Sequence, residues 1–157
     1  MSISLRSVED ADLDHIFEWQ RDPTAVAMAA FTSRDPSDRD AFDAHYRRIR
    51  ADPDCTLLAI DDDGVLVGTI GSFTMEGQRE VTYWIDPSQW GRGLASAALE
   101  ALLRIEPARP LFGRVASHNI GSATVLARAG FVHIGSETAH ADGVRRDVVE
   151  HSYRLDR

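Results

Sequence analysis

The stretch Trp90-Gly91-Arg92-Gly93-Leu94-Ala95-Ser96 is the most informative part of this sequence, and it lies between a predicted strand and a predicted helix. Glycine lets the backbone approach a ligand closely, because no Cβ stands in the way. The first N–H groups of a helix have no partner within the helix, and the helix dipole adds partial positive charge there. A phosphate group is therefore the natural ligand of this stretch, and Arg92 would add a charge-assisted contact.

This pattern alone does not say which phosphate compound binds. A Walker A loop ends in Gly-Lys-Ser or Gly-Lys-Thr, and the chain has no such tripeptide. The spacing Gly91-x-Gly93-x-x-Ser96 is similar to a dinucleotide-binding fingerprint, but that fingerprint follows the first strand of a parallel βαβ unit. Here an antiparallel meander is expected before the stretch. A nucleotide-binding module and a plain turn without a ligand both stay open as alternatives.

Strands and helices are predicted on both sides of the stretch. Three strand-like segments precede it as an antiparallel meander, and the turn 61–64 carries a glycine where a positive φ is needed. Strands that first meander and then alternate with helices predict a mixed sheet with helices on both faces, in one domain spanning residues 1–157. The helix after the stretch has an apolar stripe of Leu94, Ala98, Leu102 and Ile105. The expected strands cover residues 3–7, 56–60, 65–73, 80–85, 111–117, 131–136 and 144–155, and the expected helices residues 10–20, 37–49, 94–105 and 119–129.

Composition and charge exclude several classes of protein. Arg and Lys number 17 against 25 Asp and Glu, and the resulting net charge of −8 argues against sequence-independent binding of nucleic acid. The longest apolar run is far shorter than the roughly 18 residues of a membrane span, and the N-terminus lacks the pattern of a signal peptide. Cys55 is the only cysteine, and the histidines show no metal-ligand spacing. We therefore expect a cytoplasmic protein without a metal, a membrane or a nucleic-acid partner.

Two spaced motifs resemble those of one enzyme family. The first joins Trp84-Ile85-Asp86-Pro87 to the stretch that begins at Trp90, and the second reads Asn119-x-x-Ser122-x-x-Val125-Leu126-x-Arg128-x-Gly130-Phe131. Together with the opening residues 5–12, they are similar to the GNAT superfamily of acyl-CoA N-acyltransferases. They look most like the RimJ/RimL type, which comprises ribosomal-protein N-terminal acetyltransferases and relatives that acetylate small molecules. The resemblance implies acetyl-CoA as acyl donor and an α/β (α+β) fold, with a mixed, mostly antiparallel sheet of six to seven strands and helices on both faces.

The resemblance also assigns cofactor contacts to the residues that match the motifs. Backbone groups of the strand before the stretch would pair with the pantetheine arm, and N–H groups of the stretch would surround the pyrophosphate. Asn119 would reach the cofactor from the start of the next helix, where its ordinary role is to cap that helix. The expected cofactor-binding residues are Tyr83, Trp84, Ile85, Gly91, Arg92, Gly93, Leu94, Ala95, Ser96 and Asn119.

Acyl transfer from a thioester to an amine needs a base for the amine proton and a proton for the departing thiolate. Glu80 is the expected base, because it begins the strand that leads to the glycine stretch and because the resemblance implies a glutamate there, as RimJ/RimL-type proteins often have. A strand-end carboxylate paired with Arg79 is the alternative. Many relatives carry a tyrosine where this chain has Leu126. Ser122 or a water is then the expected proton donor, and a helix-capping role is the alternative for Ser122.

The acceptor site is expected beside Trp19, Phe31 and Phe73, although aromatic residues on such faces are more often core. The predicted function is transfer of an acetyl group from acetyl-CoA to a primary amine, by direct attack in a ternary complex. That amine is a protein N-terminal α-amine or belongs to a small molecule. A non-catalytic acyl-CoA-binding or sensor protein with the same fold is the alternative. The C-terminal hairpin could supply an edge for a homodimer.

Overall fold

One seven-stranded sheet forms the centre of the computed structural model, which describes all residues from 1 to 157. The strand order is β1-β2-β3-β4-β5-β7-β6, and every neighbouring pair is antiparallel except β4 and β5. The expected mixed, mostly antiparallel sheet is thereby confirmed. The strands are β1 (Ile3–Ser7), β2 (Thr56–Asp62), β3 (Val65–Met75), β4 (Gln78–Ile85), β5 (Leu111–Ala116), β6 (Val132–Ala141) and β7 (Arg146–Leu155).

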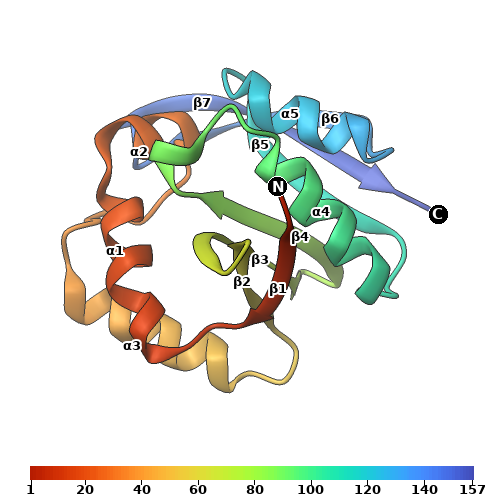
Figure 1. Ribbon diagram of the computed structural model, residues 1–157. Helices are drawn as coiled ribbons and strands as arrows, with labels where there is room; N and C mark the ends of the chain where they lie inside the picture. The colour runs from red at the N-terminus through yellow and green to blue at the C-terminus, as the bar shows by residue number, and fades with distance from the viewer.

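Five α-helices cover the two faces of this sheet, as expected. Figure 1 shows three of them, α1 to α3, gathered on one side and the other two, α4 and α5, on the opposite side. None of the helices has the length and apolar character needed to cross a bilayer. The helices are α1 (Leu13–Arg21), α2 (Pro23–Ala29), α3 (Arg39–Ala51), α4 (Leu94–Ile105) and α5 (Ile120–Arg128), with short 3-10 turns η1 (Asp10–Asp12) and η2 (Pro87–Gln89).

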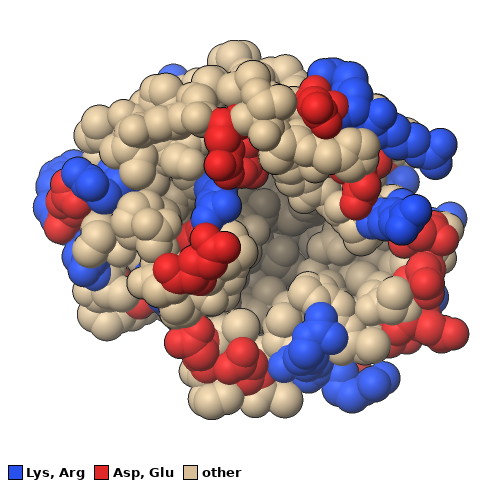
Figure 2. Space-filling view, turned by 180° about the vertical axis from the view of Figure 1, so that it is seen from behind, with Lys and Arg blue, Asp and Glu red and all other residues tan.

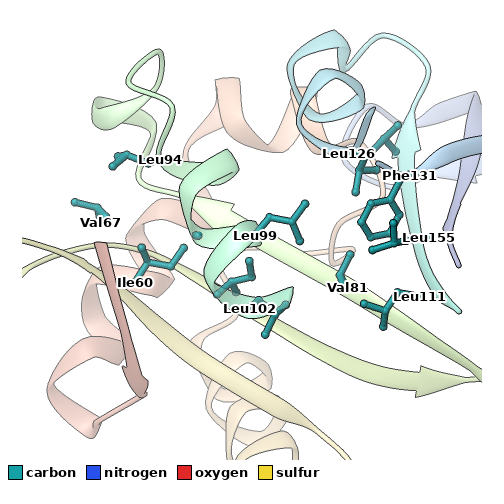
Figure 3. Close-up of a cluster of buried hydrophobic side chains, with 13 residues drawn as sticks. Ile60, Val67, Val81, Leu94, Leu99, Leu102, Leu111, Leu126, Phe131 and Leu155 are labelled. Carbon is teal, nitrogen blue, oxygen red and sulfur yellow. The ribbon is translucent and has the colours of Figure 1, made fainter. Parts of the chain in front are cut away.

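The main hydrophobic core lies between the sheet and the helices α4 and α5 (Figure 3). Leu94, Leu99 and Leu102 of α4 point into it and meet strand residues such as Ile60 and Val67. The apolar stripe predicted for α4 does not continue into the core at its last position, because Ile105 is 60% exposed. Ile105 is the last residue of the helix. The next residue, Glu106, turns back toward the sheet instead, where it accepts hydrogen bonds from Ser72 and Arg79.

Helix α2 is the element that the sequence pattern does not predict. The carboxylate of Asp22 accepts a hydrogen bond from the N–H of Ala25 over 2.9 Å, and Pro23 occupies the first helical position. Both are ordinary helix-start features, but a helix of seven residues is too short to show a clear apolar period. The position of α2 matters for function, because it forms one wall of the cleft described below.

The parallel pair β4 and β5 opens a gap in the sheet. Only two residue pairs join these strands, Arg79 with Leu111 and Glu80 with Phe112. Beyond Glu80 the strands diverge, and the second half of β4 has a neighbouring strand on one side only, where it pairs with β3. An unpaired strand edge offers backbone N–H and C=O groups to a ligand. The gap therefore determines where a substrate can enter the sheet.

Candidate active site

Two adjoining cavities occupy the gap between β4 and β5. The first has a volume of about 480 Å³ and lies among the end of β4, the start of α4, α2 and α5. The second has a volume of about 340 Å³ and lies beside the paired ends of β4 and β5. Figure 2 shows the molecule from behind, with a hollow of uncharged floor and both acidic and basic side chains around its rim. The cavities share five lining residues, which mark their junction: Ala29, Tyr83, Trp84, Asn119 and Ser122.

The first cavity contains a row of free backbone donors. None of the six consecutive N–H groups from Gly91 to Ser96 donates a hydrogen bond within the chain, and the first such bond of α4 is from Ala97 to Gly93. Gly91 and Gly93 have φ values of 83° and 76°, and a Cβ added to either would meet no atom within 4 Å. Glycine is thus required here for its backbone conformation rather than for space. Six donors at a helix start form a site for an anion.

Two arginines near this loop, Arg92 and Arg128, differ in whether they line the first cavity. Arg92 does not line the cavity; its guanidinium donates hydrogen bonds to Gln89 and Asp62. The Ser2 backbone N–H and then Arg92 hold the pKa of Asp62 below its usual value. Arg128, near the end of α5, lines the cavity and forms no ion pair or hydrogen bond within the chain. Arg128 belongs to the second sequence motif, which gave it no role, and it is the arginine that lines the cavity in place of the expected Arg92 side chain.

The end of β4 supplies the other wall of the first cavity. Tyr83, Trp84 and Ile85 all line it, in the half of the strand that β5 leaves unpaired. The indole N–H of Trp90 donates a hydrogen bond to the carbonyl oxygen of Ile85 over 3.2 Å. That carbonyl is therefore engaged within the chain. On the opposite side of the cavity, Asn119 accepts the N–H of Ser122 with its Oδ1 over 3.2 Å, so it caps α5 while its amide nitrogen is left without a partner.

Glu80 lies in the second cavity and is only 3% exposed. It does not pair with Arg79, which instead contacts Glu106; its partner is Arg114 of β5, at 2.9 Å between Oε2 and a guanidinium nitrogen. Burial raises the pKa of the Glu80 carboxyl, and the neighbouring Arg114 opposes part of that rise. A buried carboxylate with a raised pKa is the form that general bases take in enzymes.

Arg114 and Glu150 complete the charged lining of the second cavity, and neither was expected from the sequence. Glu150 lies on β7, directly opposite Glu137 of β6. Burial raises the pKa of Glu150, Arg114 lowers it, and Glu137 and Glu80 raise it further. The cavity therefore holds two carboxylates and one guanidinium, an environment that favours a cation.

The three aromatic residues expected at the acceptor site have different positions. Phe31 and Phe73 line the second cavity, together with Met75. Trp19 lines neither cavity and belongs to a separate core cluster with Ile16 and other residues of α1 and α3. Its large apolar ring is buried between α1 and the sheet, which fits the alternative that such aromatic residues belong to the hydrophobic core. We leave Trp19 out of the proposed site for this reason.

Comparison with known proteins agrees with this architecture. Residues 2–132 match the family model described as the acetyltransferase (GNAT) domain. A proposed acetyltransferase from Acinetobacter baylyi ADP1 has a TM-score of 0.82 at 17% identity, over 100% of this chain and 95% of that one. A spermidine N-acetyltransferase from Vibrio cholerae, in complex with CoA and spermine, has a TM-score of 0.78 at 18% identity, over 98% and 95%. A phosphinothricin acetyltransferase from Sinorhizobium meliloti with bound AcCoA has a TM-score of 0.78 at 18% identity, over 99% and 90%. No curated protein matches the sequence.

Proposed function

The chain belongs to the GNAT acetyltransferase family, and from this premise we propose that residues 1–157 act as one catalytic domain that acetylates a primary amine. Acetyl-CoA is the donor, and the amine attacks it directly in a ternary complex. The observation that carries the proposal is the meeting of two unlike cavities between β4 and β5. One contains six unpaired backbone donors suited to phosphate, and the other contains the buried carboxylate of Glu80.

On the donor side, the residues present fit the chemistry of CoA. The N–H groups from Gly91 to Ser96 would hold the pyrophosphate, and Arg128 would contact a phosphate at the other wall. Tyr83 and Trp84 would pair their backbone with the pantetheine arm, and Asn119 would use its free amide nitrogen. When bound, acetyl-CoA supplies an acetyl group activated as a thioester.

On the acceptor side, Glu80 would remove the proton that a primary amine carries near neutral pH. Its raised pKa makes it a stronger base than an exposed glutamate. Phe31 and Phe73 would enclose the apolar part of the acceptor, and Glu150 would favour an acceptor that brings a positive charge. Direct attack needs no nucleophilic side chain of the protein.

Cys55 is not a candidate for a covalent intermediate. It lines neither cavity, and burial together with Asp52 raises the pKa of its thiol, so little of it is the reactive thiolate. As a free cysteine it fits a reducing compartment, and we place the enzyme in the cytoplasm.

The acceptor is either a protein N-terminal α-amine, as in the RimJ/RimL type, or a small-molecule amine. The motifs around Asn119 and Arg128 resemble the RimJ/RimL type, whereas spermidine is the acceptor named for one structural neighbour. A panel of short peptides with free N-termini, tested beside diamines, polyamines and amino acids, separates the two classes. Acetylation of one class alone identifies the acceptor.

A homodimer through the β6 edge is part of the proposal. β6 is the last strand of the sheet, and Val132 and Ile134 on it are exposed. An unprotected edge strand of this length can pair with a second copy. Sedimentation equilibrium tests this, and replacement of Ile134 by Lys is expected to leave a monomer if the edge forms the interface.

Calorimetric titration with acetyl-CoA, with NAD as control ligand, tests the donor half of the proposal. We expect micromolar binding of acetyl-CoA and none of NAD. The variant Gly93→Val should abolish binding, because valine at a φ of 76° deforms the phosphate loop. Gly77→Val is the matched control: Gly77 has a φ of 78° and equally open surroundings, but it lies in the turn between β3 and β4 and lines neither cavity.

Turnover with an acceptor tests the enzymatic half. Glu80→Gln should bind acetyl-CoA normally and lose most of its activity. If the wild-type protein binds acetyl-CoA but acetylates no amine of the panel, the sensor alternative replaces the enzyme. If it binds NAD and not acetyl-CoA, the donor assignment itself is wrong.

A further inference from the structure

The junction of the two cavities contains a pair of hydroxyl groups. Tyr83 on β4 and Ser122 on α5 both line the two cavities, and their hydroxyl oxygens lie 2.7 Å apart. The Tyr83 hydroxyl can also donate a hydrogen bond to the carbonyl oxygen of Ser122 over 3.3 Å. Of the other junction residues, Ala29 has no polar side chain, the indole N–H of Trp84 is buried without a partner, and Asn119 is engaged in capping α5. The two hydroxyls are therefore the only side-chain O–H groups at the junction.

Two hydroxyls that share one hydrogen bond have one O–H hydrogen to spare. If Tyr83 donates to the Ser122 hydroxyl, the serine hydrogen is free. If Ser122 donates instead, the tyrosine hydrogen has the carbonyl oxygen of Ser122 as its acceptor, so the free hydrogen belongs to the first arrangement. The free hydrogen can point to a group that sits between the donor and acceptor sites. Under the proposed function, that group is the sulfur of the thioester, because the bond that breaks must lie where the two substrates meet.

We propose that the paired hydroxyls of Tyr83 and Ser122 form a hydrogen-bond donor that stabilises the thiolate of CoA as it leaves. This inference rests on the proposed function and adds a catalytic role for the Tyr83 side chain. In the step, the amine nitrogen forms a bond with the thioester carbon and the carbon–sulfur bond breaks. The electron pair of that bond goes to sulfur, and the thiolate leaves with its charge held by the hydroxyl pair. Glu80 has taken the ammonium proton before the attack, and the second N–H proton, which the nitrogen loses as the amide forms, passes to water.

The acidity of the pair favours stabilisation over proton transfer. Burial raises the pKa of Tyr83 to about 12. A CoA thiol resembles a cysteine thiol, whose ordinary pKa is about 8.5, so a thiolate does not take the proton from such a phenol at equilibrium. The hydroxyl pair consequently keeps its hydrogen and acts as a fixed donor toward developing negative charge, as an oxyanion hole does. The thiolate takes its proton from water after release. Of the two proton sources expected from the sequence, Ser122 and water, the proposal thus takes water.

Binding of CoA and of desulfo-CoA tests the inference without any acceptor. A donor that points at sulfur binds the thiolate more tightly than the thiol, so the pKa of the CoA thiol should be lower in the complex than in free CoA. The ultraviolet absorbance of the thiolate, followed as the pH is raised, measures this pKa. We expect the wild-type protein to prefer CoA over desulfo-CoA about tenfold above the pKa of the bound thiol. Tyr83→Phe and Ser122→Ala should each reduce that preference to about onefold to threefold while leaving the affinity for desulfo-CoA unchanged.

The double variant and a control make the result specific. Because the two hydroxyls act as one donor, Tyr83→Phe/Ser122→Ala should lose no more than the worse single variant. Tyr153→Phe removes a tyrosine hydroxyl that lines neither cavity and should keep the tenfold preference. In turnover, Tyr83→Phe should lower kcat about 100-fold with the KM for acetyl-CoA within threefold of wild type.

Two results overturn the inference in distinguishable ways. If the wild type binds both compounds equally tightly, or Tyr83→Phe keeps the full preference for CoA, the hydroxyl pair does not contact sulfur and only holds β4 against α5. The proposed function then stands without it. If the wild type binds neither compound, the proposed function is wrong, and the role of Tyr83 falls with it.

Discussion

The backbone N–H of Gly143 donates a hydrogen bond to the carbonyl oxygen of Ala30 over 2.8 Å, and this contact ties the β6–β7 turn to the end of α2. Ala30 has a φ of 62° and a ψ of −52°, and the N–H of Phe31 reaches back to the carbonyl of Ala29 over 2.7 Å. This is the strained form of the γ-turn, which a residue with a side chain adopts only when its surroundings impose it. Ala29 and Phe31, on either side of it, line the second cavity. The strained turn therefore shapes the acceptor site.

Gly143→Ala is expected to weaken acceptor binding and leave CoA binding intact. A Cβ at this position would lie 2.7 Å from the carbonyl oxygens of Ala30 and Val26, so the turn must move away from α2. We expect a loss of about 1 to 3 kcal/mol in unfolding free energy and a several-fold rise in the KM for the amine. Gly135→Ala, on the same hairpin with no atom within 4 Å of the added Cβ, is the control. An unchanged KM in a destabilised Gly143→Ala protein would show that the turn does not form the acceptor wall.

The donor half of the site could be predicted from sequence because its chemistry is local. The glycines at 91 and 93 and the start of α4 lie within one short stretch, and the free N–H groups follow from helix geometry alone. The exception is the side chain of Arg92, since nothing in the stretch indicates that Asp62, at the end of β2, would bind it. Arg128 lies one helix further along and enters the cavity only through tertiary packing.

The acceptor half could be predicted only in part: the resemblance to the family indicated Glu80, and nothing in the sequence indicated Arg114 or Glu150. Glu80, Arg114 and Glu150 lie on three different strands, and only the order β4-β5-β7 brings them to one cavity. A charged residue within a strand pattern indicates a solvent-facing position unless the partner strand is known. Trp19 shows the converse problem, because an aromatic residue on a helix face has the same pattern whether it lines a pocket or fills the core.

Arg128→Ala is expected to weaken CoA binding about tenfold, because an exposed guanidinium without a partner in the chain is available to a phosphate. The loss should shrink at high salt, where exposed charges are screened. Arg104→Ala removes the same charge from the far end of α4 and should leave the affinity unchanged. Titration calorimetry at two salt concentrations measures both. Equal affinities of the Arg128 and Arg104 variants would remove Arg128 from the donor site.

Arg6 is expected to stabilise the fold in a pH-dependent manner. Its guanidinium contacts both carboxylate oxygens of Asp12, at 2.8 and 3.0 Å, and Asp61 at 2.8 Å. These bonds hold the pKa of Asp12 below its ordinary value, so their stabilisation is present above the pKa of unfolded aspartate and is lost as the pH falls through the lower folded value.

Arg6→Ala should therefore cost about 2 to 4 kcal/mol near pH 7, since it leaves the buried Asp12 without its partner. The difference from wild type should shrink in urea unfolding below about pH 4, where unfolded aspartate takes up protons. Arg154→Ala breaks an exposed pair with Asp156 and should cost less than about 1 kcal/mol. A constant difference from pH 7 to pH 3 would contradict the assignment to Asp12.

Glu80→Gln is expected to remove activity without lowering stability. A general base must be deprotonated, so kcat/KM should rise with pH through the pKa of Glu80, at a pH above the ordinary glutamate value because burial raises that pKa. The same shift has the opposite consequence for folding. A carboxyl whose pKa is raised in the folded protein favours the protonated form, so unfolding free energy falls as pH rises through that pKa.

Neutral glutamine at position 80 avoids this cost while it can still accept the hydrogen bond from Arg114. We expect kcat to fall at least about 100-fold, the acidic limb of the pH profile to disappear, and the Tm at pH 7 to equal or exceed that of wild type. Glu100→Gln, on the exposed face of α4, should change none of the three quantities. Wild-type kcat in Glu80→Gln would exclude Glu80 as the base, and a lowered Tm with lost activity would point to a structural role for its pair with Arg114.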